Sequence, residues 1–333
     1  MRYIFVNLLL TIVFLPITAQ KVTNVEFWQE GKKVNISYNL DESADVCVSI
    51  STDGGKTFSS PLKQVAGDIK SVTPGKKTIV WDVLSEQEKL VGENICFRVT
   101  AFGGKRSFTV KGVTFNMIGV EGGTFTMGAT HEQESPSNDE KPTHLVALSS
   151  YYIGETEVTQ ELWQAVMGNN PSHFKSKTNP VENVSWNNCL EFVTKLNSFT
   201  SENFRFPTEA EWEFSARGGK KSNGYQYSGS NDLNEIAWYF NNSNKTTHHV
   251  ATKVANELNI YDMSGNVMEW CQDDYGSYSY SLQENPKGSS YGSNKVVRGG
   301  CWDDYFECRS SARENFLKST KGSTIGFRLA LSE

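Results

Sequence analysis

The stretch Arg298-Gly-Gly-Cys-Trp-Asp-Asp-Tyr-Phe-Glu-Cys-Arg-Ser-Ser-Ala-Arg313, followed by Ile325-Gly-Phe-Arg328, is the most informative part of this chain. Five shorter motifs precede it: Met117–Met127, Glu155–Thr159, Asn183–Trp186, Phe206–Glu213 and Tyr261–Trp270. A single short motif is weak evidence for a fold, whereas several that occur together are strong evidence. Together these motifs cover roughly residues 112 to 331, so one domain is expected to span about two thirds of the chain.

In this order, the motifs resemble those of the formylglycine-generating enzyme family, also called sulfatase-modifying factors. Members of that family share a compact, irregular fold similar to that of C-type lectins. The resemblance implies an α+β domain of this kind over residues 112–333, and the many Gly, Asn and Ser residues of this region suit its long turns. Residues 130–142 are predicted to be a mobile, exposed loop of this domain.

The first residues have the pattern of a secretory signal peptide. Arg2 is followed by an apolar run from Ile4 to Pro16, and Thr18-Ala19 supplies small residues for cleavage. The run is too short to span a bilayer comfortably. Because Gln20 rather than a cysteine follows, a bacterial lipoprotein anchor is not expected. We expect residues 1–19 to be removed and the protein to be secreted or periplasmic, with no transmembrane anchor after cleavage.

Residues 20–102 alternate between apolar and polar positions over short runs, as at Val34, Ile36 and Tyr38. Period-two runs bounded by turn residues predict a small antiparallel β-sandwich. The Gly- and Lys-containing residues 103–111 are predicted to be a linker between this sandwich and the second domain.

The cysteine content is compatible with three disulfides in an oxidising compartment. The six cysteines stand at positions 47, 96, 189, 271, 301 and 308. Cys47 and Cys96 each lie in a predicted strand of the sandwich, so either a cross-strand disulfide or two buried thiols are expected there. The pairing of the other four does not follow from their spacing.

The formal net charge is −6, and the Lys and Arg residues form no cluster. A nucleic-acid or anionic-membrane partner is therefore not expected. Neutral or cationic ligands and metal ions are compatible with this charge.

Capping residues mark the starts of the helices. Thr159 precedes one apolar-periodic run, and Thr208-Glu-Ala-Glu211 forms a capping box that opens another helix. Because capping explains Glu211, we predict that Glu209 and Glu213 are exposed to solvent rather than paired for acid–base catalysis.

The resemblance also implies a structural calcium site. Asp262, Gly265, Val267 and Glu269 occupy the positions of the family's calcium ligands, two through side-chain oxygens and two through backbone carbonyls. Calcium takes oxygen ligands, which a turn flanked by two acids can supply. A lone buried carboxylate at Glu269 would be costly, and a salt bridge or turn hydrogen bonds are the alternative to calcium.

In catalytic members of the family, a serine follows the R-G-G motif, and two cysteines a few residues further on bind copper(I). Here Cys301 stands in place of the serine, Asp304 in place of the first copper cysteine, and Cys308 beside Arg309. Copper(I) prefers soft thiolate ligands, so this copper centre is expected to be lost. Cys301 and Cys308 are then half-cystines, or weak catalytic candidates as a register-shifted copper pair.

Around these cysteines we predict an acidic and aromatic cleft suited to a polar or cationic ligand. Its predicted lining consists of Trp302, Asp303, Asp304, Tyr305, Glu307 and Arg309. We therefore expect an exported binding or assembly protein whose ligand is a protein, peptide or glycan. The alternative, which family membership alone would suggest, is a copper-dependent oxidoreductase that converts a cysteine of sulfatases to formylglycine.

Overall fold

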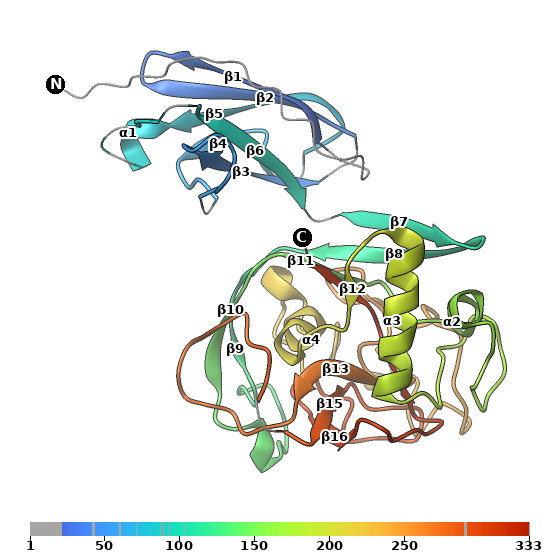
Figure 1. Ribbon diagram of the computed structural model, residues 1–333. Coiled ribbons are helices and arrows are strands. Elements are labelled where there is room, and N and C mark those ends of the chain that lie inside the picture. Colours follow the sequence, from blue (N-terminus) through green and yellow to red (C-terminus); the bar gives the residue numbers. More distant parts are fainter. Residues whose placement is uncertain are drawn as a thin grey trace. The chain divides into compact units, whose positions relative to one another are not determined.

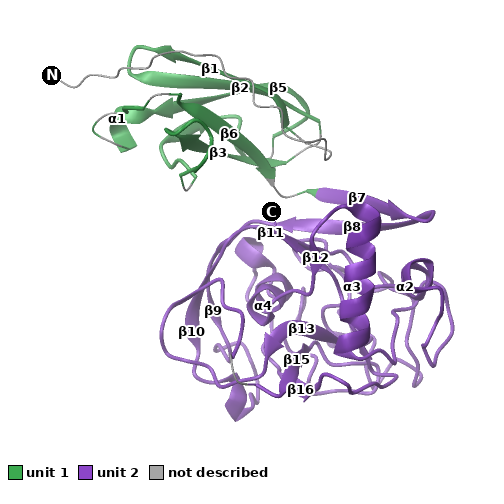
Figure 2. Cartoon of the chain, in the orientation of Figure 1, with its two compact units in different colours: residues 1–104 green, residues 105–333 purple. Residues whose placement is uncertain are grey.

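The computed structural model describes residues 22–41, 44–59, 61–70, 72–86, 88, 90–92, 94–102, 104–289 and 292–332. The predicted signal peptide at residues 1–19 lies outside these ranges. The chain divides into two compact units between Gly104 and Lys105, which are coloured separately in Figure 2. Within the described ranges, no helix has the length and apolar character needed to cross a membrane.

The first unit is the antiparallel β-sandwich that its alternating pattern predicted. Its elements are β1 (Val22–Glu30), β2 (Lys33–Leu40), β3 (Asp45–Ser51), β4 (Val65–Gly67), β5 (Gly75–Asp82), α1 (Val83–Glu86) and β6 (Cys96–Phe102). One sheet has the strand order β1-β2-β5-β4, and β3 pairs with β6 in the second (Figure 1). Ile36, Val48 and Trp81 belong to one core that both sheets share.

Of the two alternatives at Cys47 and Cys96, the cross-strand disulfide does not form, and the two thiols are partly exposed. The register pairs Cys47 with Thr100 and Ser51 with Cys96. Cys47 therefore lies opposite a residue four positions (96 to 100) from Cys96, or roughly 13 Å along the strand at ~3.3 Å per residue. A disulfide requires Cα atoms within about 7 Å of each other. All six cysteines of the chain are thiols in the structure.

The second unit is an α+β domain with many short strands and few helices. Its strands are β7 (Lys105–Val110), β8 (Val113–Val120), β9 (Gly123–Met127), β10 (His144–Leu148), β11 (Tyr151–Gly154), β12 (Phe204–Arg205), β13 (Met268–Asp274), β14 (Gln283–Glu284), β15 (Asn294–Arg298), β16 (Glu314–Leu317), β17 (Ile325–Gly326) and β18 (Ala330–Ser332). Its helices are η1 (Asn138–Glu140), α2 (Gln160–Met167), α3 (Trp186–Thr200), α4 (Glu209–Ala216), η2 (Gly219–Lys221) and α5 (Leu233–Ile236).

The described strands of this unit form three sheets. Their strand orders are β12-β18-β11-β8-β7, β16-β15-β13-β17 and β14-β10-β9. The prediction that residues 103–111 form a linker is wrong for most of this segment, because residues 105–110 form the edge strand β7, paired with β8. Phe108 and Val110 of β7 pack on the core of the unit, and this burial holds the segment in the sheet.

Helix α4 lies between the sheets and packs against β9, β10, β13 and β15 (Figure 1). The predicted capping box forms: the Thr208 hydroxyl accepts a hydrogen bond from the Glu211 N–H, and Glu211 accepts one from the Thr208 N–H. The prediction that Glu209 and Glu213 are exposed is wrong, because they are only 4% and 0% exposed. Arginines from distant segments compensate these buried charges.

Candidate functional site

The buried carboxylates of α4 anchor both ends of the segment from Arg298 to Arg313. Arg298 donates hydrogen bonds to Glu209 at 2.8 Å and to Glu213 at 2.7 Å. Arg313 donates to the two oxygens of Glu209 at 2.6 and 2.8 Å. Burial alone would raise the pKa of Glu209, but the guanidinium groups of Arg313 and Arg298 lower it to about 2. The residues between the two arginines therefore form a loop with fixed ends.

The glycines after Arg298 fold this loop back on itself. Gly299 and Gly300 have φ angles of 98° and 64°, in the left-handed region that glycine adopts readily. A Cβ atom on Gly300 would lie 2.8 Å from the Sγ of Cys308, so a side chain there would collide with the thiol. Cys301 and Cys308 are both buried, at the two ends of the loop that runs between them.

The environment of these two cysteines keeps them protonated. Burial raises the pKa of Cys301 to about 12, and Asp304 and Asp303 add to this shift. Burial likewise raises the pKa of Cys308 far above its ordinary value, with contributions from Asp304 and Cys301. Nucleophilic cysteines and copper(I) sites use the thiolate form, which nearby cations stabilise. The charged groups acting on this pair are carboxylates, which have the opposite effect.

Between the two cysteines, the loop presents carboxylates and aromatic rings to solvent. We call residues Trp302, Asp303, Asp304, Tyr305, Phe306 and Glu307 the acidic-aromatic surface. Tyr305 and Phe306 are 47% and 70% exposed. Among the ion pairs of the described residues, none involves Asp303, Asp304 or Glu307. The three carboxyl groups of this part of the loop therefore have no ion-pair partner among the described residues.

Burial and neighbouring acids together raise the pKa of Glu307. Burial raises the pKa of Glu307 to about 7, and the carboxylates of Glu314 and Asp304 add to the shift. Burial also raises the pKa of Asp304. A cation at this surface would relieve the repulsion and favour the ionised forms.

Arg309 and the predicted cleft both differ from expectation. Arg309 is only 5% exposed, and it donates two hydrogen bonds of 2.7 Å to Glu140. Arg309 therefore anchors the loop instead of lining a cleft. Its partner Glu140 belongs to residues 130–142, which were predicted to be mobile and exposed, but Glu140 is fully buried. The crevice lined by Gly300, Glu307 and Glu314 has no volume open to a water molecule. The site that the loop offers is thus a surface.

A segment distant in sequence extends this surface. The backbone N–H of Phe240 donates to the Asp304 carbonyl at 3.0 Å, and the Phe240 side chain is 56% exposed. Trp302 also anchors the loop, because its indole N–H donates to the Ser323 carbonyl at 2.9 Å. Sequence reasoning did not include Phe240 or Phe306. Phe306 could have been found from its place in the motif, whereas nothing in the sequence links Phe240 to it.

At the predicted calcium loop, the structure pairs Glu269 with an arginine. Arg328 donates to the two carboxylate oxygens of Glu269, both at 2.6 Å, and the Trp212 indole N–H donates to one of them at 2.7 Å. Glu269 is 1% exposed, so its charge is compensated inside the protein. The arrangement corresponds to the salt-bridge alternative.

Asp262 is the acid of this loop that retains a free oxygen. One of its oxygens accepts a hydrogen bond of 2.7 Å from the Ala251 N–H, and the other is buried without a partner among the residues that the structure describes. Gly265 and Val267 lie in the same loop, as predicted, but the described residues contain no group of three or more His, Cys, Asp or Glu side chains able to hold a metal. Arg328 engages both oxygens of Glu269 in this structure. Calcium binding at Asp262, Gly265, Val267 and Glu269 stays a prediction.

Several known proteins are similar in sequence to the second unit of this chain. Residues 107–333 match the family described as "Sulfatase-modifying factor enzyme 1-like domain". The chaperone protein LppX of Paenibacillus barcinonensis is 33% identical over 240 residues, which cover 57% of this chain and 79% of LppX. The formylglycine-generating enzyme of Mus musculus is 32% identical over 218 residues, which cover 59% of this chain and 56% of the mouse enzyme.

One solved structure is similar to this chain in both sequence and fold. Treponema denticola variable protein 1 is 34% identical, with a TM-score of 0.63, and the match covers 69% of this chain and 99% of that protein. The relatives' names include an enzyme and a chaperone, so the names alone do not decide the activity of this chain. Because the family match extends over more than half of its length, the chain belongs to the sulfatase-modifying factor enzyme 1-like family.

Proposed function

We propose that this protein is an exported binding or assembly protein that holds a cationic peptide or protein segment on its acidic-aromatic surface. The observation that carries the proposal is the coincidence of carboxylates without ion-pair partners and exposed rings. Asp303, Asp304 and Glu307 supply the charge, and Tyr305 and Phe306 supply the apolar area. Export is supported by the signal-peptide pattern of residues 1–19.

The chemistry of the surface favours Lys or Arg side chains as its ligand. A guanidinium or ammonium group can stack on an aromatic face while donating hydrogen bonds to a carboxylate. Aromatic residues such as Tyr and Trp are also enriched among the few residues that dominate the binding energy of protein interfaces. A neutral glycan would use the rings but would leave the repulsion between Asp304 and Glu307 unrelieved, so a basic peptide fits better. The relative named as a chaperone is consistent with a protein ligand.

A titration with labelled peptides tests this proposal. An arginine-rich peptide should bind the full chain more tightly than a glutamate-rich peptide of equal length. Asp304→Asn and Phe306→Ala should each weaken binding by about tenfold, or ~1.4 kcal/mol. Asp41→Asn, which changes an exposed carboxyl of the first unit, is the matched control and should bind like the wild type. Equal affinity for both peptides, or unchanged affinity in both surface variants, would contradict the proposal.

The absence of copper chemistry is the second part of the proposal. The buried, protonated thiols of Cys301 and Cys308, surrounded by acids, support it. After reduction and loading with copper(I), the purified protein should leave a cysteine-containing sulfatase peptide unchanged in mass. A peptide mass that fits formylglycine, lost in both Cys301→Ser and Cys308→Ser, would establish the oxidoreductase alternative instead.

A further inference from the structure

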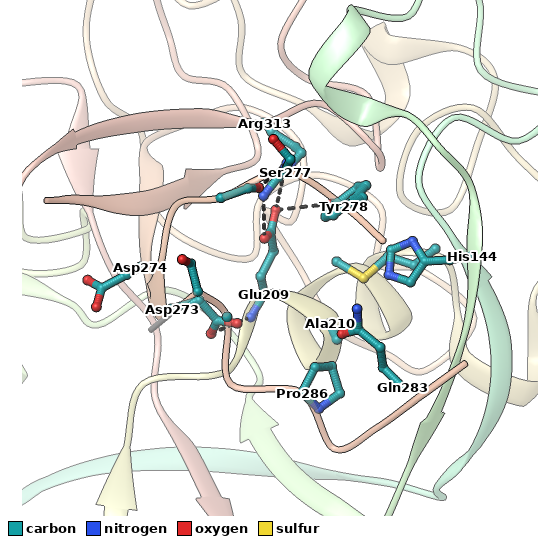
Figure 3. Close-up of a pocket in the computed structure, with 14 residues that line it drawn as sticks. His144, Glu209, Ala210, Asp273, Asp274, Ser277, Tyr278, Gln283, Pro286 and Arg313 are labelled. Carbon is teal, nitrogen blue, oxygen red and sulfur yellow. Dashed lines mark hydrogen bonds and ion pairs between the residues drawn. The ribbon is translucent and has the colours of Figure 1, made fainter. Parts of the chain in front are cut away.

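A cavity of about 190 Å³ lies at the start of α4 and shares no lining residue with the acidic-aromatic surface. Its walls come from β10, α4, the end of β13 and the loop from Gly276 to Ser289 (Figure 3). Met127 of β9 and Arg313 complete the lining. Drug-sized ligands occupy pockets of about 300–1,000 Å³, so this cavity suits a molecule of only a few heavy atoms.

The loop that closes the cavity is fixed at two places. β14 pairs with β10 in parallel, with Val146 opposite Gln283. Further along, Gly288 forms a β-bridge with Asp274. Gly288 has a φ of 78°, and a Cβ atom there would lie 2.6 Å from the Cβ of Asp273. Glycine therefore allows the loop to approach Asp273 closely, and the cavity has a defined wall there.

The charges around the cavity leave one carboxyl group without a cation. Arg313 neutralises Glu209 through its Nε and Nη2 groups, and its Nη1 group donates to the carbonyls of Asp139 and Gly276. Asp274 forms an ion pair of 2.8 Å with Lys295. Asp273 has no ion pair among the described residues.

Asp273 is also incompletely hydrogen-bonded, although it is only 2% exposed. One of its oxygens accepts a hydrogen bond of 2.9 Å from the Glu209 N–H. Its other oxygen accepts none from the part of the chain that the structure describes. Burial raises the pKa of Asp273 to about 8, and the carboxylate of Glu209 contributes to this shift. Lys295 lowers this pKa but does not offset the burial, so the protonated form is favoured at neutral pH, and a cation in the cavity would favour the ionised form.

Two further polar groups face Asp273 from the other side of the cavity (Figure 3). His144 is 5% exposed, its Nδ1 lies 3.3 Å from the Pro142 carbonyl, and its ring contacts Tyr278. The His144 Nε2 has no hydrogen-bond partner among the described residues, and neither has the side-chain amide of Gln283. A ligand that reaches across the cavity could use both of these groups.

We propose that this cavity binds a small organic cation, with its ammonium group at Asp273 and a hydroxyl or amide group at His144 and Gln283. An ammonium group carries three donors and no acceptor, which matches the unused oxygen of Asp273. A compact amino alcohol has the required size and both kinds of polar group. An anionic ligand would instead meet the carboxyl groups of Asp273, Asp274 and Glu209, while Lys295, Arg298 and Arg313, the cations that pair with these groups among the described residues, are already engaged.

Three probes of nearly equal size test the charge preference by NMR titration of the full chain. Ethanolamine carries a hydroxyl and an ammonium group, ethylene glycol replaces the ammonium by a hydroxyl, and glycolate replaces it by a carboxylate. Only ethanolamine should shift amide signals of the cavity lining in a saturable way. Saturable binding of glycolate or ethylene glycol with equal affinity, or no saturable binding of ethanolamine, would overturn the proposal.

Variants locate the binding. Asp273→Asn keeps an oxygen for the Glu209 N–H but removes the charge, and it should weaken ethanolamine binding at least tenfold. Gln283→Leu changes the opposite wall without touching the start of α4, and it should weaken binding several-fold even if Asp273→Asn disturbs the fold. Asp41→Asn is the matched control and should bind like the wild type. Ethanolamine affinity that is unchanged in both cavity variants would place any binding elsewhere and refute the proposal.

Discussion

Replacing Arg328 by methionine should destabilise the second unit severely. Arg328 is 0% exposed, and it donates to both oxygens of Glu269 at 2.6 Å. It also donates to the carbonyls of Gly154 and Tyr261 at 3.0 and 2.9 Å. Methionine would occupy much of the space of the side chain but would remove every hydrogen bond that Arg328 donates, leaving Glu269 with only the one from the Trp212 indole N–H.

The expected loss follows from the burial of the remaining charge. Glu269 would stay buried close to Glu157 and Asp262, whose carboxylates repel one another. Removing one partner of a buried ion pair costs about 3–5 kcal/mol. In a domain of this size, each kcal/mol lowers the melting temperature by about 2–4 °C. The transition of the second unit should therefore move down by about 6–20 °C.

The assay is differential scanning calorimetry of the full chain, with Arg205→Met as the matched control. Arg205 also pairs with both oxygens of a glutamate, at 2.6 and 2.7 Å to Glu211, but its side chain is 26% exposed. The control should cost only about 1 kcal/mol, as partly exposed pairs do. Equal losses in the two variants would refute the reasoning that burial of the Arg328–Glu269 pair determines its contribution.

Three further predictions concern calcium, pH and the two units. Calcium in hundredfold excess over its dissociation constant should stabilise the protein by about 3 kcal/mol, and Glu269→Gln should remove most of this stabilisation. Identical melting curves with chelator and with calcium would contradict calcium binding and support the salt bridge as the role of Glu269. Because burial raises the pKa of Asp273 to about 8, folding retains a proton there. The contribution of Asp273 to stability in urea should therefore fall as pH rises from about 4 to about 8, by up to ~1.4 kcal/mol per unit, and Asp273→Asn should lose stability less steeply with pH than the wild type; parallel curves would contradict it. Limited proteolysis should yield a stable fragment with an end between residues 100 and 115, near the division between Gly104 and Lys105; stable fragments that all end elsewhere would argue against this boundary.

Local signals in the sequence were sufficient for the elements of the fold and for one part of the site. The capping box at Thr208 forms as predicted because its hydrogen bonds join residues three apart. The alternation in the first unit predicts its strands, since side chains of a strand point alternately to its two faces. The residues from Trp302 to Glu307 share one surface because a single loop carries them.

The tertiary structure alone decided which charges are buried and which are left without a partner. Glu209 and Glu213 have the spacing of exposed helical residues, but Arg313 and Arg298, at separations of 104 and 85 residues, make their burial possible. Likewise, Phe240 joins the acidic-aromatic surface, and His144 and Asp273 face one cavity, only after distant segments pack together. The energy of a buried charge depends on which groups surround it in space, and neither periodicity nor capping carries that information.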